Sequence, residues 1–236
     1  MPNTLFLRLE GPLQSWGERA RWSIRDTAPE PTKSGVVGLL GCALGWESDD
    51  ALRELSDAIR IGVRCDRPGS VLVDYHTVTG GVMSAEGKVK RNATTREPET
   101  VVSYRSYLCD ASFLLAVQSG SEWIERLEQA LDAPVWPVYL GRKSCPPSRS
   151  VYEGVGEYAG LEEALTRWPL RLRLPGNGQR DKVPSQVTAR VRLVLETSLA
   201  NGTRRRDGTG RNSLRMFLPR YTRDVMLDLP VAWEEV

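Results

Sequence analysis

The chain contains a single histidine, His76, which stands in the triplet Asp74-Tyr75-His76. The triplet contains a base and a proton donor, but one histidine near the end of a strand is more often a structural or stacking residue. Any catalytic triad would have to use this one ring, and a histidine-rich metal site is excluded. The composition therefore argues against common hydrolytic chemistry.

The cysteines also predict no metal site, because they are too far apart in the sequence for a paired metal-ligand motif. The four are Cys42, Cys65, Cys109 and Cys145. Nothing in the sequence indicates a secreted, disulfide-bonded chain, so we expect reduced thiols that are mostly buried. We predict neither a metal nor a cofactor.

Lys33-Ser34 matches the end of a phosphate-binding loop, but the rest of that motif is missing. The motif requires glycine immediately before the lysine and another five residues earlier, where this chain has Thr32 and Thr27. ATP binding is therefore not supported. A helix that begins here would still present the amides of Ser34 and Gly35 to an anion, with Lys33 beside them. The alternative is an ordinary helix cap.

Three further segments mix aromatic or amide side chains with cations. Arg105 and Tyr107 suit base stacking and phosphate pairing, although they equally suit an ordinary strand. The turn at 139–147 carries Arg142 and Lys143, which suit a phosphate or are simply exposed turn charges. The polar loop at 11–31 adds Gln14, Trp16, Arg19, Arg21 and Arg25.

The positive charge of the chain is concentrated near its C-terminus. The formal net charge is only +2, yet residues 171–223 contain 13 Lys and Arg against 3 Asp and Glu. Two segments there alternate apolar residues with arginine, the second through Arg190 and Arg192, and would place four arginines on one face if they pair. Such a face suits a phosphate backbone, or it is a solvated surface.

The apolar pattern predicts a mixed α+β fold. Alternation at 4–9 predicts a half-buried strand, and further strands are expected at 61–65, 71–78 and 111–117. Helices are expected at 33–44, from residue 49, and at 122–131. The glycines of the first helix, at 35, 38 and 41, predict the close approach of another backbone. Loops are expected at 175–185 and 201–212.

Residues 79–103 depart from this pattern, because they are polar and have few core-forming side chains. A segment of this length inside a compact domain indicates a long β-hairpin or a functional loop. The chain length fits one main unit with insertions. We expect a cytoplasmic protein, since there is no signal peptide pattern and no apolar run approaching the roughly 18 residues of a membrane helix.

Five ordered blocks between residues 7 and 146 carry a family resemblance. They lie at 7–17, 31–41, 74–78, 104–113 and 139–146, and include LRLEGPLQSWG, PTKSG, DYHTV, YRSYLCDASF and YLGRKSCP. Together they resemble the CasD family, whose members are subunits of the type I-E CRISPR Cascade complex. The resemblance fades after about residue 150, so the basic C-terminal third receives no assignment from it.

The resemblance implies a ferredoxin-like, RRM-like domain of the RAMP superfamily, formed by residues 1–78 and 104–236, with 79–103 as an inserted β-hairpin thumb. It implies a non-catalytic subunit that binds the 5′ handle of the guide crRNA and caps the CasC backbone filament in antiviral defence. Expected partners are also the large CasA subunit, other Cascade subunits and target DNA within the complex.

The resemblance also suggests which residues contact RNA. The principal candidates are Lys33, Ser34, Gly35, His76, Arg105, Tyr107, Arg142 and Lys143. Additional nucleic-acid contacts are expected from Gln14, Trp16, Arg19, Arg21, Arg25, Arg190 and Arg192.

Two other functions remain open. In type I-C systems the equivalent subunit is a metal-independent endoribonuclease that processes precursor crRNA. Such cleavage needs a base near the 2′-OH and a cation at the departing 5′-oxygen, which His76 with Lys33 or Lys143 would supply. The other function is a purely structural bridge between subunits, against which the arginine-rich segments argue.

Overall fold

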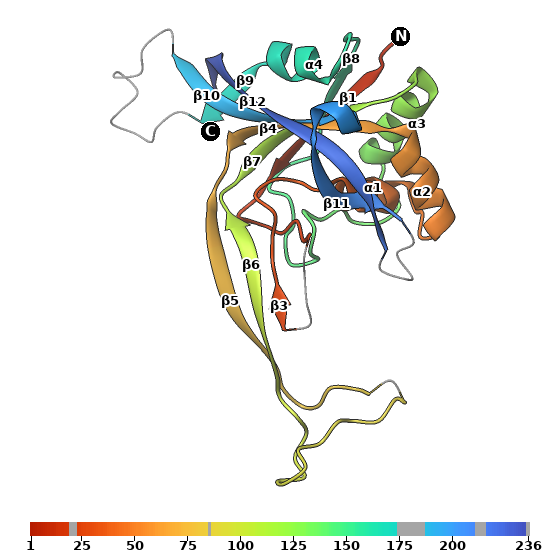
Figure 1. Cartoon of the computed structure of the whole chain (residues 1–236), viewed down its shortest axis with the longest axis vertical. Helices are drawn as coiled ribbons and strands as arrows, with labels where there is room; N and C mark the ends of the chain where they lie inside the picture. Colours follow the sequence, from red (N-terminus) through yellow and green to blue (C-terminus); the bar gives the residue numbers. More distant parts are fainter. Residues whose placement is uncertain (19–22, 85, 174–186, 211–215, 235–236) are drawn as a thin grey trace.

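The structure is a computed structural model that describes residues 1–18, 23–84, 86–173, 187–210 and 216–234. A body built around one large sheet carries a long hairpin, β5 (Ser70–Val78) and β6 (Val101–Cys109), which projects away from it (Figure 1). The predicted α+β class is confirmed. The loop expected at 175–185 and the candidates Arg19 and Arg21 lie outside the described residues.

The large sheet has the strand order β11-β12-β10-β4-β7-β1-β8, and β9 pairs with β12 beside that path. Its strands are β1 (Thr4–Glu10), β4 (Arg60–Arg67), β7 (Ser112–Gln118), β8 (Tyr152–Gly156), β9 (Leu170–Arg173), β10 (Thr188–Thr197), β11 (Thr203–Thr209) and β12 (Phe217–Glu234). A short 3-10 turn, Leu199–Asn201, joins β10 to β11. The strand β7 lies at the centre, antiparallel to both β1 and β4.

Helices cover both faces of this sheet. The helices α1 (Lys33–Leu44), α2 (Asp49–Ala58) and α3 (Ser121–Asp132) contribute to the larger core, and α4 (Leu161–Arg167) covers the other face. Because side chains of a strand alternate between faces, a central strand here is apolar at nearly every position. The sheet and the first three helices form the frame on which the candidate site is built.

The first strand is buried on both faces, which corrects the prediction of a half-buried strand. Leu7 belongs to the larger core, while Phe6 faces the other side and stacks on Trp168 at a centroid distance of 4.1 Å. Arg8 is only 2% exposed and donates a 2.6 Å hydrogen bond to Asp66. The alternation of apolar residues with Arg8 predicted that one face of the strand is exposed to water. That prediction was wrong because the sequence does not show the ion pair between Arg8 and Asp66.

The helix α1 has the predicted bounds, but its glycines do not all meet a neighbour. A Cβ at Gly35 would come within 2.8 Å of the Trp16 ring, and one at Gly41 within 2.5 Å of Leu52. A Cβ at Gly38 would meet nothing within 4 Å. Side chains, not another backbone, therefore approach two of the glycines, and the third faces open space.

The C-terminal strands differ from the sequence prediction. The strand β12 lies between β9 and β10, so the two arginine-bearing segments do not pair with each other. The strand β11 occupies most of the expected loop at 201–212 and pairs with β12. With the sequence TRRRDGT, β11 has no apolar pattern, and backbone pairing and ion pairs hold it in place.

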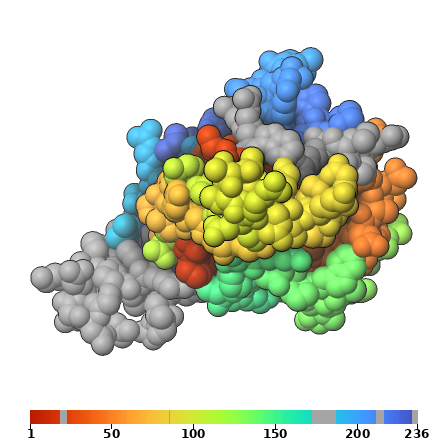
Figure 2. Space-filling view, turned by 90° about the horizontal axis from the view of Figure 1, so that it is seen from below, coloured from red at the N-terminus to blue at the C-terminus, as the bar shows by residue number. Residues whose placement is uncertain are grey.

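The hairpin belongs to a second sheet, in which β6 pairs with β5 and with two short strands, β2 (Leu13–Gln14) and β3 (Ile24–Arg25). Beyond the paired arms, isolated bridges join Met83 to Val89 and Arg91 to Pro98. Seen from below, the end of the hairpin (yellow) stands in front of the body (Figure 2). The division into a ferredoxin-like domain and a thumb remains a prediction.

Candidate nucleic-acid interface

The first turn of α1 is fixed by its cap. Thr32 is the N-cap residue, and its hydroxyl accepts a hydrogen bond from the amide of Gly35 at 3.3 Å. The amide of Lys33 donates to the Asp207 carboxylate at 3.0 Å. Ser34 lies between them, and its side chain lines a pocket. This end of the helix is therefore ordered before any ligand binds.

A tight turn at 139–146 lies beside the start of α1. The amide of Leu140 donates to the carbonyl of Cys145, and the amide of Ser15 donates to the carbonyl of Leu140. Gly141 has φ of 93°, and a Cβ there would lie 1.8 Å from the Ser15 carbonyl oxygen. Only glycine fits this approach, which brings Lys143 next to α1.

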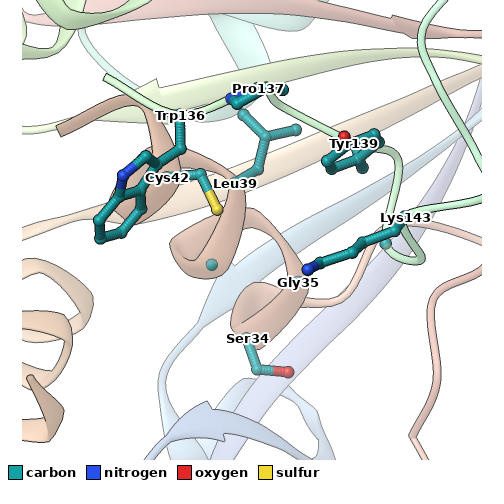
Figure 3. Close-up of a pocket in the computed structure, with 10 residues that line it drawn as sticks. Ser34, Gly35, Leu39, Cys42, Trp136, Pro137, Tyr139 and Lys143 are labelled. Atoms are coloured by element: carbon teal, nitrogen blue, oxygen red, sulfur yellow. The ribbon is translucent and has the colours of Figure 1, made fainter. Parts of the chain in front are cut away.

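A pocket of about 560 Å³ opens between α1 and this turn (Figure 3). Its walls come from Ser34, Gly35, Gly38, Leu39 and Cys42 of α1 and from Trp136, Pro137, Tyr139, Gly141 and Lys143. Lys143 is the only charged residue among them, and its ammonium group extends towards the start of α1. The pocket is otherwise apolar and aromatic.

A second hollow of about 260 Å³ shares Gly35 and Gly141 with the first. Its lining includes two cations from different segments, Arg25 and Arg142, and also the acidic residue Asp26. Within the described part of the chain, neither Arg25 nor Lys143 forms an ion pair with a carboxylate. The two joined hollows thus form one concave surface with a cation in each.

Arg142 holds together the segments that form this surface. Its guanidinium donates to the backbone carbonyls of Ser106, Arg25 and Asp26 at 3.1, 2.9 and 3.4 Å. It also lies over the ring of Tyr107, 4.6 Å from the centroid. The predicted phosphate contact from Arg142 is not what this geometry favours, because its donors are used to join the turn to β3 and β6.

One face of the hairpin carries polar side chains next to this surface, together with the apolar residues Leu72, Val78 and Val101. In the pairing of β5 with β6, Asp74 lies opposite Arg105, and His76 lies opposite Ser103. The strand β3 adds Arg25 beside Arg105. Residues directly opposite each other share a face of the sheet, so these side chains point to the same side. Tyr107, two residues after Arg105, extends this face to the ring over which Arg142 lies.

The opposite face of the hairpin is apolar and exposed. Its side chains are 50–66% exposed: Ile24 60%, Val71 66%, Val73 56%, Tyr75 60% and Tyr104 50%. The register places Tyr75 opposite Tyr104, and their rings make an edge contact at 5.6 Å. We call these five residues the apolar hairpin face. Apolar side chains gathered on an extended arm are typical of a protein interface.

Lys33 does not reach either hollow with its side chain. The ammonium group donates to the Ile59 carbonyl and to the Glu196 carboxylate, both at 2.9 Å, and the residue is 7% exposed. The prediction that Lys33 binds phosphate is therefore corrected for the folded chain. A buried cation with two acceptors stabilises the contact between α1 and the C-terminal strands.

Gln14 and Trp16 are also structural residues. Gln14 is fully buried and donates to the carbonyls of Leu9 and Ala111 at 3.0 and 2.8 Å. Its amide oxygen accepts a hydrogen bond from the indole of Trp16, which is 1% exposed. The prediction of a nucleic-acid contact from Gln14 is corrected, because its amide is buried and hydrogen-bonded, whereas Trp16 lines the second hollow and stays a candidate.

Much of the C-terminal positive charge is neutralised by carboxylates. Arg192 pairs with Glu30 at 2.5 Å and with Asp224 at 3.0 Å, which corrects its prediction as a nucleic-acid contact. Arg220 pairs with Asp207 at 2.5 Å. Arg190 is exposed and stays a candidate. In the described part of the basic stretch, several arginines therefore serve ion pairs of the fold.

The cysteines are free thiols, of which Cys65 and Cys145 are buried. Burial raises the pKa of Cys65 to about 12 and also raises the pKa of Cys145, so both stay protonated at neutral pH. Among the described residues no group of three metal-ligating side chains occurs. No helix in that same part of the chain is long and apolar enough to span a membrane.

The sequence predicted Ser34, Gly35 and Lys143 but not the other residues that line the larger pocket. Trp136 and Tyr139 flank Pro137 in a segment without periodicity, and Gly38 was grouped with two packed glycines. Two aromatics on either side of a proline, followed by Arg142-Lys143, were the available signal. Their meeting with α1 depends on the tertiary structure.

The fold and the site together define a Cas protein. The CRISPR-associated protein family Cas_Cas5 matches residues 4–227, so the chain belongs to this family. It is similar to the CRISPR system Cascade subunit CasD of Escherichia coli (strain K12), with 38% identity over 181 residues, 71% of this chain and 78% of the relative.

Solved structures agree with this membership. A chain of a CRISPR RNA-guided surveillance complex is 32% identical and superimposes with a TM-score of 0.76, covering 97% of this chain and 93% of that one. A crystal structure of a Cas protein is 37% identical, with a TM-score of 0.67 and coverage of 95% and 94%. The similarity therefore extends over nearly the whole chain.

Proposed function

We propose that this chain is the CasD-type subunit of a type I-E Cascade complex and that it holds the 5′ handle of the guide crRNA. The observation that carries the proposal is the pair of adjoining hollows beside α1. Lys143 lines the larger hollow and Arg25 the smaller one, and neither forms an ion pair in the described residues. Phosphates neutralise such cations and release counterions. The similarity to a Cascade subunit supports a place in such a complex.

The two faces of the hairpin suit two kinds of partner. The polar face, with Arg105 and His76, adjoins the hollows and would follow the RNA. The apolar hairpin face would pack on a neighbouring CasC backbone subunit, where the chain caps the filament. Contacts with CasA, with other Cascade subunits and with target DNA complete the proposed complex.

The proposal includes no catalysis. Cleavage of precursor crRNA would require a base and a cation at one place. His76 is on the projecting hairpin, the ammonium group of Lys33 is held inside by Glu196, and Lys143 lines the pocket beside α1. The His76 ring lies beside the Asp74 carboxylate, with Nδ1 3.7 Å from the nearer oxygen. A purely structural bridge is less consistent with the site, because it gives the two hollow-lining cations no ligand.

Binding of handle RNA tests the proposal directly. The full chain should bind a synthetic 5′-handle RNA, and Lys143→Ala with Arg25→Ala should weaken binding and lower the salt slope by about 0.7 for each lost contact. Arg223→Ala is the matched control, since Arg223 pairs with Glu162 on the exposed surface. Equal binding by the double variant and the control variant would rule out this site.

Incubation with a labelled repeat transcript tests the non-catalytic assignment. We expect the transcript to stay intact in the absence of metal, with the His76→Ala variant as the comparison. Cleavage at one position that is lost in His76→Ala would instead establish the endoribonuclease function. Dissociation of the RNA before gel analysis separates binding from cutting.

A further inference from the structure

Gly38 is exceptional among the glycines of α1. Gly35 and Gly41 leave room for Trp16 and Leu52, whereas a Cβ at Gly38 would meet nothing within 4 Å in the described structure. A glycine inside a helix lowers stability relative to alanine, and no close neighbour in the described residues explains this one. The space beside it belongs to the 560 Å³ pocket.

We infer that this pocket receives one unstacked base of the RNA, with the adjoining phosphate at Lys143. This inference rests on the proposed function and names the part of the RNA that the site binds. Gly38 lines the pocket together with Leu39 and the aromatic residues Trp136 and Tyr139. Proteins bind single-stranded RNA bases by stacking them on such side chains.

The volume and polarity of the pocket agree with a base. A cavity of about 560 Å³ is within the range of small-ligand sites. Its floor includes the Cys42 thiol, whose pKa is raised by burial, so the floor is uncharged at neutral pH. A flat, apolar ring system fits this floor better than a charged group does.

The charge at the mouth favours RNA over a protein side chain as the occupant. Lys143 is the only charged lining residue, and its ammonium group extends across the opening towards Gly35 (Figure 3). The hydroxyl of Ser34 lines the same side. An apolar protein side chain would leave this cation without a counterion, whereas a nucleotide brings its own phosphate to it.

Filling the pocket at Gly38 tests the inference without disturbing the core. Gly38→Leu places a side chain in the open space, and Gly38→Ala is the matched control with the same helix change and little filling. Both variants should have a Tm equal to or above that of the parent chain. Gly38→Leu should bind 5′-handle RNA about tenfold more weakly, and Gly38→Ala within about twofold.

A series of handle RNAs, each with one abasic position, identifies the base. The parent chain should lose about tenfold in affinity at one position, and Gly38→Leu should show no further loss at that position because the base is already displaced. If the parent chain does not bind the RNA, the proposed function fails and the inference with it.

The remaining outcomes concern the pocket alone. If the parent chain binds handle RNA and Gly38→Leu binds it equally well, the handle function stands and the pocket assignment is overturned. If Gly38→Leu weakens binding but every abasic position still adds its full loss, the occupant is not a base. In that case the pocket contacts another part of the RNA, such as a sugar or a phosphate, and the inference is wrong.

Discussion

The two most cationic regions of this chain use their charges in different ways. In the C-terminal strands, Arg192, Arg205 and Arg220 pair with carboxylates, and Glu30 serves both Arg192 and Arg205. Beside α1, Lys143 and Arg25 line hollows and form no ion pair in the described residues. The density of arginine in a sequence therefore does not locate an anion site, because distant carboxylates decide which cations are available.

The largest expected effect lies in the C-terminal strands. Arg220 is 6% exposed and donates to Asp207 through two nitrogens. Arg220→Met should lower the free energy of unfolding by about 3–5 kcal/mol, because it leaves a buried carboxylate unpaired. Urea unfolding measures the loss. Arg206→Ala, at an exposed position, should change the free energy of unfolding by less than about 0.5 kcal/mol. Similar losses in both variants would contradict the distinction between buried, paired arginines and exposed ones.

A smaller effect is expected at Arg142, which lines the second hollow but uses its guanidinium to hold neighbouring segments together. Arg142→Lys keeps the charge but cannot reach three carbonyls and lie flat on Tyr107, so we expect a loss of about 1–3 kcal/mol in thermal or urea unfolding. Lys143→Arg is the neighbouring control and should leave stability unchanged. Unchanged stability in Arg142→Lys would show that the contacts of Arg142 with the carbonyls and Tyr107 do not stabilise the fold.

The smallest expected effect is the pH dependence of stability that comes from the paired carboxylate Asp207. Burial alone would raise the pKa of Asp207, but Arg220 and the amide of Lys33 outweigh it, so this pKa lies below its usual value. The stabilisation is therefore full above the unfolded-state pKa of about 3.9 and is lost as pH falls through the folded-state value.

Urea unfolding of the parent chain and Asp207→Asn at several pH values measures this dependence. The difference in unfolding free energy between them should be largest near neutral pH and shrink below about pH 4. A difference that stays constant down to pH 3 would show that the charge of Asp207 does not stabilise the fold.

Local signals account for the parts of the fold that were predicted well. The helix α1 was predicted with its correct bounds because Thr32 caps it and Gly45 ends it in the left-handed conformation, at φ of 71°. The strand β11 was taken for a loop, and α4 and β12 were not predicted. Their stability depends on pairing and packing with residues far away in the sequence.

The candidate site was predicted in part. Ser34, Gly35 and Lys143 were among the predicted residues and line the larger pocket, and Arg25 lines the second hollow with Arg105 beside it. Lys33 and Gln14 were assigned to that surface from the same kind of evidence, but they are buried among acceptors. A polar side chain near a predicted site can serve the fold or the ligand, and sequence does not separate the two.

The apolar hairpin face has a consequence for how much of this protein a cell can maintain. Side chains such as Val71 and Tyr75, more than half exposed, would remain in water whenever the chain is made in excess of its partners. Exposed apolar strands promote aggregation and are recognised by chaperones and proteases. The amount of free chain that a cell can maintain therefore depends on how much of the partner that covers this face is present.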